Sequence, residues 1–190
     1  PPRPPTPRPP NPEELLDKVY GLYRKEREVE KAEPRFDFVT DVAAGDEMER
    51  VLVHDRDIVV FGSGFLGGGS YTYTTMGFAE ASDILHVTAR DLTGDGKAEI
   101  MARGILHVEA GEDLGGAMVD RYAVYVYKVL GERMQRVFAA ETGRALGSNR
   151  VLGGIAFRPV GRGIHIELLP GRAVGWNERS YPFPEDTLAE

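Results

Sequence analysis

The segment HVTARDLTGDGKAEIMAR, residues 86–103, contains the pattern that decides the fold. Two runs rich in alternating apolar and β-branched residues, typical of β-strands, flank an acidic loop that holds two glycines. The connection is too short for a crossover helix, so the two strands are predicted to pair antiparallel.

The same alternation recurs through residues 35–175, where Gly and Asp clusters separate the strands. The other strand-like runs are FDFVT, RVLVH, DIVVF, SYTYTT, YAVYVYKV, QRVFAAE, RVLGGIAF and GIHIELL. No second long helix is predicted after the N-terminal segment. We therefore expect an all-β, mainly antiparallel domain over residues 34–190.

A Pro-rich linker is predicted over residues 1–11, because PPRPPTPRPP favours polyproline II and cannot pack a core. A ligand for an SH3-like groove is the alternative function of this segment. The chain begins with Pro rather than Met, which indicates a processed chain or a piece of a longer protein.

An amphipathic helix is predicted within residues 12–33, running to about residue 31 before Pro34 stops it. Asn11 and Glu14 have the spacing of a capping box. The helix docks on the body or on a partner through an apolar stripe made of Leu15, Leu16, Val19, Leu22, Tyr23 and Val29.

Three segments that start fifty residues apart, at Phe36, His86 and Arg136, suggest an internal repeat. In each, a predicted strand ends at an acidic residue, and Glu or Asn follows eight residues later; these pairs are Asp41 with Glu49, Asp91 with Glu99, and Glu141 with Asn149. Fifty residues is the size of a propeller blade, but three units are fewer than the usual minimum of about four. Blade-like sheets and a sandwich both remain open.

Calcium binding is predicted for the acidic loop, because this cation takes six to eight oxygen ligands, many of them carboxylates. Asp91, Thr93, Asp95 and Glu99 place side-chain oxygens at alternate positions, and Lys97 would add its backbone carbonyl. An EF-hand is excluded, because Ala102 stands at the twelfth position and a strand follows. An ion-free turn closed by Asp side chains is the alternative.

The loop resembles the D-x-D-x-D-G-x-x-D calcium loop of FG-GAP and VCBS repeats, the blades of integrin-α-like propellers. The resemblance is limited to about fifteen residues, from Thr88 to Ala102. It implies a strand–loop–strand blade and a structural Ca²⁺ ion held by the five loop residues. Thr93 in place of a carboxylate implies weakened binding.

Composition excludes several function classes. The chain has 190 residues with a net charge of -7, which argues against nucleic acid and anionic membranes. It has no cysteine and no apolar run long enough to span a membrane. Gly62, Gly64 and Gly67 match a dinucleotide fingerprint, but a predicted strand follows where the fingerprint needs a helix.

These observations predict a non-catalytic, calcium-stabilised β-domain that acts as a protein-interaction or scaffold module. No nucleophile elbow or histidine metal motif is present, so no enzyme activity is expected. Calcium supply favours the cell envelope or the extracellular space. The alternative is a domain that binds carbohydrate or hydrolyses carbohydrate or ester, with a glycan stacked on the Tyr-rich strands.

Overall fold

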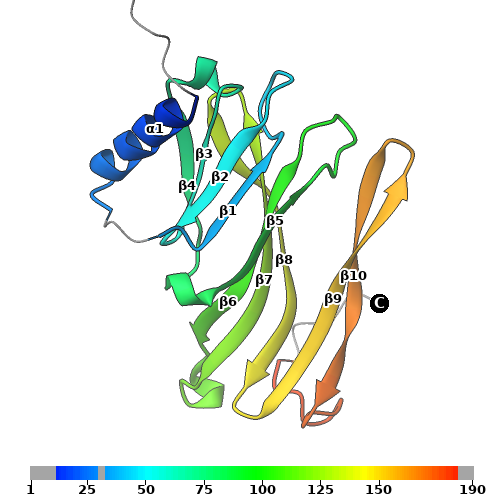
Figure 1. Ribbon diagram of the computed structural model, residues 1–190. Coiled ribbons are helices and arrows are strands. Elements are labelled where there is room, and N and C mark those ends of the chain that lie inside the picture. The colour runs from blue at the N-terminus through cyan, green and yellow to red at the C-terminus, as the bar shows by residue number, and fades with distance from the viewer. Residues whose placement is uncertain (1–11, 30–32, 184–190) are drawn as a thin grey trace, which may run out of the picture.

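The structure, a computed structural model, describes residues 12–29 and 33–183 and consists of one helix and two antiparallel sheets (Figure 1). The helix α1 spans Pro12–Glu26. One sheet has the order β1-β2-β3-β4, with β1 Phe36–Thr40, β2 Glu49–His54, β3 Asp57–Phe61 and β4 Tyr71–Thr75. This confirms the prediction of an all-β, mainly antiparallel domain with an N-terminal helix.

The second sheet is a six-stranded meander. Its order is β10-β9-β8-β7-β6-β5, with β5 Ile84–Arg90, β6 Glu99–Glu109, β7 Met118–Leu130, β8 Arg133–Leu146, β9 Asn149–Val160 and β10 Gly163–Val174. Three short 3-10 helices lie in the connections, at Leu66–Gly68, Ala81–Asp83 and Glu112–Leu114. Within the described residues, no helix has both the length and the apolar character needed to cross a membrane.

The main core lies between the two sheets. Val51, Val53 and Val60 contribute to it from the small sheet, and Ile100 and Tyr125 from the large one. Every residue of β3 is buried, because α1 covers the outer face of the small sheet with Val19 and Tyr23. The amphipathic stripe of the helix therefore docks on the body, as one of the two predictions stated.

Asp57 fixes the helix to the sheet. Its carboxylate, on β3, accepts hydrogen bonds from Tyr23 Oη at 3.0 Å, Arg27 Nε at 3.3 Å and Thr75 Oγ1 at 2.5 Å. Burial and the neighbouring Asp57 carboxylate raise the pKa of Tyr23, which keeps its hydroxyl protonated as a donor. The buried charge thus has three donors, from α1, from the turn that follows it and from β4.

The predicted end of α1 near residue 31 is wrong, because the helix stops at Glu26. Glu28 adopts φ 54°, and Val29 N donates to Arg24 O at 3.0 Å, which is a Schellman motif without glycine. Val29 still packs against the cluster beneath the helix. Asn11 and the rest of the predicted linker over 1–11 lie outside the described residues.

The β9–β10 hairpin separates from the rest of its sheet (Figure 1). Only Gly143–Leu146 of β8 pair with β9, through residues 149–152. Beyond that point the hairpin packs Phe157, Ile164 and Ile166 over Leu92, Met101 and Val126 on the opposite face of the large sheet from the main core. This arrangement curls the sheet and leaves a fork between β8 and β9.

The expectation that a strand ends at Glu141 is wrong. Glu141 lies inside β8, pairs with Ala123 of β7, and is followed by a tight turn between Leu146 and Asn149. In the segment after β10, Trp176 is buried and its ring contacts Tyr181 and Phe183 edge-on.

Replacement of Tyr23 by Phe tests the anchor of the helix. We expect the free energy of unfolding to fall by about 1–3 kcal/mol, because a buried hydrogen bond to a charged carboxylate is lost. Tyr71→Phe is the matched control, since its hydroxyl bonds Glu26 in an exposed position. Urea unfolding of both variants measures the difference; equal losses would contradict the assigned role of Asp57.

Candidate functional site

The predicted calcium loop joins β5 to β6 and is closed by the pair Arg90↔Glu99. Asp91 organises the turn, since its Oδ1 accepts from Gly94 N at 2.7 Å and its Oδ2 from Gly96 N at 2.9 Å. Both glycines have positive φ, 72° and 86°, which other residues adopt only at a cost. Both carboxylate oxygens of Asp91 therefore accept hydrogen bonds from the backbone of the same turn.

The Lys128 ammonium lies among the other predicted ligands. This side chain comes from β7, and its Nζ donates to Glu99 Oε1 at 2.6 Å, Asp95 Oδ2 at 2.7 Å and Thr93 Oγ1 at 3.0 Å. An ammonium has three donors, and all three are used. The loop thus brings Thr93, Asp95 and Glu99 together around a cation that belongs to the protein.

Glu99 is the buried member of this cluster. Its side chain is 2% exposed, and its Oε2 accepts from Leu92 N at 2.7 Å while Oε1 faces Lys128. Burial opposes the charge of Lys128, but the hydrogen bonds to Asp95 and Glu99 raise its pKa above the ordinary value. The Lys128 hydrogen bond likewise lowers the pKa of Asp95. The charges of Lys128 and Asp95 therefore stabilise each other.

A divalent cation does not fit this donor set while Lys128 stays in place. Three of the five predicted ligands already bind the ammonium, and Asp91 is committed to the turn. Among the described residues, no group of three or more His, Asp or Glu side chains could hold a metal ion. The Lys128 nitrogen therefore lies among three of the side-chain oxygens that were predicted to bind calcium.

Lys97, the fifth predicted ligand, turns away from its own loop. Its Nζ donates to Asp41 Oδ1 at 2.7 Å, to Asp41 Oδ2 at 2.8 Å and to the carbonyl of Gly45. These groups belong to the earlier acidic loop, between β1 and β2. Lys97 is therefore the cation of that loop, a role its sequence position did not indicate.

The two acidic loops share one frame. Thr40↔Glu49 closes the first as Arg90↔Glu99 closes the second, at the same spacing. Glu49 is fully buried, and its Oε2 accepts from Val42 N at 2.9 Å and Ala43 N at 3.0 Å. In both loops a buried glutamate at the start of the second strand holds the backbone at the start of the loop.

Each loop also supports the next structural unit. Ala98 N, at the end of the second loop, donates to Asp41 O at 2.7 Å, and Ile164 N of the β9–β10 hairpin donates to Leu92 O at 2.9 Å. A Cβ at position 94 would collide with the carbonyl of Arg162, so Gly94 permits this close approach. The acidic loops are thus joints between the sheets and the hairpin.

The glycine run at 62–67 has a packing role. Strand β4 follows it antiparallel to β3, as the sequence predicted, and no βαβ unit forms. A Cβ at position 64 would collide with Oε1 of the buried Glu49. Close packing on the first acidic loop therefore explains Gly62 and Gly64, whereas Gly67 adopts a positive φ of 70° with open space around it.

His107 forms a separate charged cluster on the large sheet. Its Nδ1 lies 2.6 Å from Asp120 Oδ1, and its Nε2 lies 3.2 Å from Asp83 Oδ1. Hydrogen bonds to Asp120 and then to Asp83 raise the pKa of His107. No sequence motif pointed to this cluster, since Asp83 and Asp120 are distant in sequence.

Replacement of Glu99 by Gln tests the buried pair. The free energy of unfolding should fall by about 3 kcal/mol, because the change leaves the Lys128 charge without its buried partner. Asp95→Asn is the matched control on the same ammonium; Asp95 is 48% exposed, so less than about 1 kcal/mol should be lost. Chemical denaturation measures the free energy of unfolding of both variants. Equal losses would show that the burial of Glu99 does not strengthen its pair with Lys128.

Replacement of His107 by Gln tests the raised pKa. A raised pKa in the folded state stabilises the protein fully below about pH 6.5, and this contribution is lost as the pH rises through the folded pKa. The melting temperature of the variant should therefore lie below that of the wild type in acid and approach it in alkali. His165→Gln, at an exposed position of β10, removes a histidine outside the cluster and is the control for the substitution itself.

Comparison with known proteins leaves the resemblance as a prediction. No family model matches the chain, and no curated protein or solved structure matches it either. The loop's similarity to FG-GAP and VCBS blades therefore stands on the sequence pattern alone.

Proposed function

We propose that the chain is a non-catalytic protein-interaction module that binds an extended peptide segment at the fork between β8 and β9. The observation that carries this proposal is the short β8–β9 ladder. In the described residues, β8 pairs with β9 only from Gly143 to Leu146. The edge of β8 that faces away from β7 is therefore unpaired from Arg133 to Thr142. Exposed strand edges are templates for an added strand.

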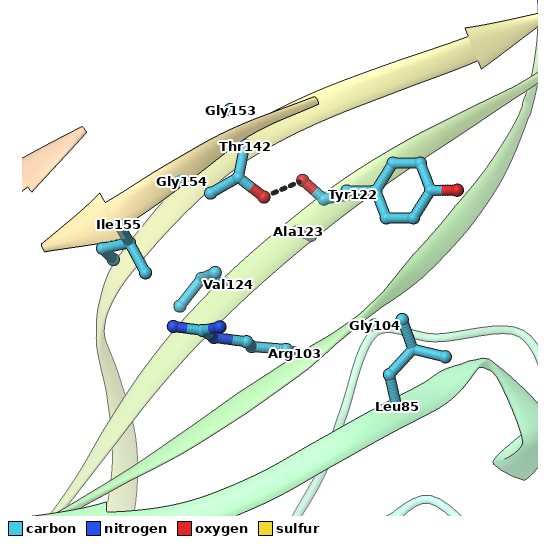
Figure 2. A pocket seen from close by; sticks show the side chains of 10 residues that line it. All are labelled: Leu85, Arg103, Gly104, Tyr122, Ala123, Val124, Thr142, Gly153, Gly154 and Ile155. Carbon is cyan, nitrogen blue, oxygen red and sulfur yellow. Dashed lines mark hydrogen bonds between the residues drawn. The ribbon is translucent and has the colours of Figure 1, made fainter. Parts of the chain in front are cut away.

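A groove of about 200 Å³ opens at this fork (Figure 2). Apolar side chains and glycines line most of it, and Arg103 of β6 extends beside Val124 toward the strand that carries Ile155. Among the described residues, no ion pair involves Arg103, although the protein carries a net charge of -7. A carboxylate on the incoming segment would complement it.

The size of the groove favours a docked side chain over a small-molecule substrate, because ligand pockets usually measure about 300–1,000 Å³. No carboxylate lines this groove, whereas glycosidases need two. Two further grooves of the described residues hold one carboxylate each, Glu141 and Glu26. These observations support binding over hydrolysis.

The carbohydrate alternative has less support. Tyr71 and Tyr73 lie near each other on β4, but Arg27 lies over the Tyr73 ring at 4.5 Å and Tyr23 contacts the Tyr71 ring edge-on at 5.5 Å. The rings are used for packing beneath and beside α1. The expected envelope or extracellular location follows only from the calcium prediction, and the proposed binding does not depend on it.

Selection of a displayed peptide library on the folded protein tests the proposal. We expect enriched peptides with alternating apolar residues and one Asp or Glu. Arg103→Glu should weaken their binding at least about tenfold, since the change removes about 1.4 kcal/mol or more. Val137→Lys should weaken it similarly, because Val137 is exposed on the β8 edge and lysine blunts such edges.

Val160→Lys is the matched control, since Val160 is also an exposed valine, at the far end of β9, and does not line the groove. It should bind the peptides like the wild type. If the enriched peptides bind the Arg103→Glu and Val137→Lys variants as tightly as the wild type, the fork is not the binding site. Turnover of chromogenic glycosides or esters by the wild type would instead support the hydrolase alternative.

A further inference from the structure

The last three strands of the large sheet carry a charge opposite to that of the whole protein. Residues 133–174, from the start of β8 to the end of β10, contain seven arginines, no lysine and only two acidic residues, Glu141 and Glu167. The complete chain has a net charge of -7, so the remainder of the protein is strongly acidic. Charge separated in this way attracts a partner of opposite sign to one part of the surface.

Both acidic residues of this region are already paired. Glu141 pairs with Arg121 and Arg144, and Glu167 pairs with Arg158. Among the described residues, no ion pair involves the other five arginines of the region, all of them exposed: Arg133, Arg136, Arg150, Arg162 and Arg172. The positive charge of β8–β10 is therefore not neutralised within the described part of the chain.

Arginines stand near both ends of the open edge of β8. Arg103 lines the groove and is level with Ala140 of β8, because both pair with Val124 of β7 (Figure 2). Arg133 begins the open edge at its other end. Arg90 of β5 also reaches the hairpin, where its guanidinium lies 5.7 Å from the ring centre of Phe157.

The open edge decides which kind of anion fits. An unpaired strand edge presents a row of N–H and C=O groups, which another polypeptide backbone can pair with and a phosphate backbone cannot. Val137 on this edge is exposed and apolar. A long nucleic acid would also extend over the acidic remainder of the protein, which repels phosphates. An acidic polypeptide therefore suits the fork better than a nucleic acid.

We propose that the partner of the fork is an acidic, extended protein segment with carboxylates at both ends of an apolar stretch, and that the surrounding arginines steer it into place. This inference rests on the proposed function, since the fork must first bind a peptide. A strand that spans Arg133 to Thr142 measures about 30 Å, at about 3.3 Å per residue. Physiological salt screens exposed charges beyond about 8 Å, so one carboxylate cannot serve both Arg103 and Arg133.

Binding kinetics of the peptides selected on the folded protein test the chemistry of the partner. The enriched peptides should carry Asp or Glu on both sides of their apolar residues. Arg133→Glu should slow their association about fivefold in about 50 mM salt, and the difference should shrink in about 500 mM salt, because salt screens the attraction. Arg133→Lys keeps the charge and should associate within about twofold of the wild type.

Two further variants separate local charge from general charge and from strand pairing. Lys18→Glu reverses one exposed charge on α1, on the other side of the molecule from the hairpin, and should bind like the wild type (Figure 1). Val137→Lys adds positive charge to the open edge but blunts it for pairing. It should weaken binding in spite of the added charge.

Enriched peptides that are uncharged, and that associate with the wild type at a rate independent of salt, would overturn the acidic partner. If Val137→Lys still weakens those peptides, the proposed function stands without this inference. Acidic peptides that bind Val137→Lys as tightly as the wild type would instead contradict pairing at the fork, and with it the proposed function. A single-stranded oligonucleotide that competes with the peptides at equal concentration would show that the arginines recognise any polyanion, which would overturn the protein partner.

Discussion

The ion pair between the Lys128 ammonium and the buried Glu99 carboxylate is the interaction on which the large sheet depends. Removal of a carboxylate from water costs several kcal/mol unless a partner charge and further hydrogen bonds offset it. Here the partner comes from β7, and the second oxygen of Glu99 holds the backbone of Leu92. The loop can therefore keep its shape only if β5, β6 and β7 are assembled together.

The same constraint organises the whole molecule. The first loop receives Lys97 from the second, and the second loop receives the hairpin tip through Ile164 and Leu92. Contacts pass from one loop to the next in chain order, so the two sheets and the hairpin are fixed relative to one another at these joints. The β8–β9 fork lies between the short β8–β9 ladder and the tip of the hairpin, where β9 has already left β8.

The sequence predicted the strands well, because alternation and glycine clusters report directly on antiparallel pairing. The sequence did not predict the end of α1 or the roles of two lysine side chains. The end of α1 depends on Glu28 in a left-handed conformation, which no glycine announced. Lys128 stands in the run YAVYVYKV and has the appearance of an ordinary polar position on a strand; a lone lysine among apolar residues was the only signal. The position of Lys97 suggested a carbonyl ligand, while its side chain serves another loop.

A crystal structure of the wild-type protein grown in millimolar calcium tests the central claim most directly. Lys128 Nζ should remain within hydrogen-bond distance of Glu99 Oε1 and Asp95 Oδ2, with no anomalous peak inside the loop. A calcium peak bound by Asp95 and Glu99, with the Lys128 side chain turned out to solvent, would contradict the role assigned to the ammonium.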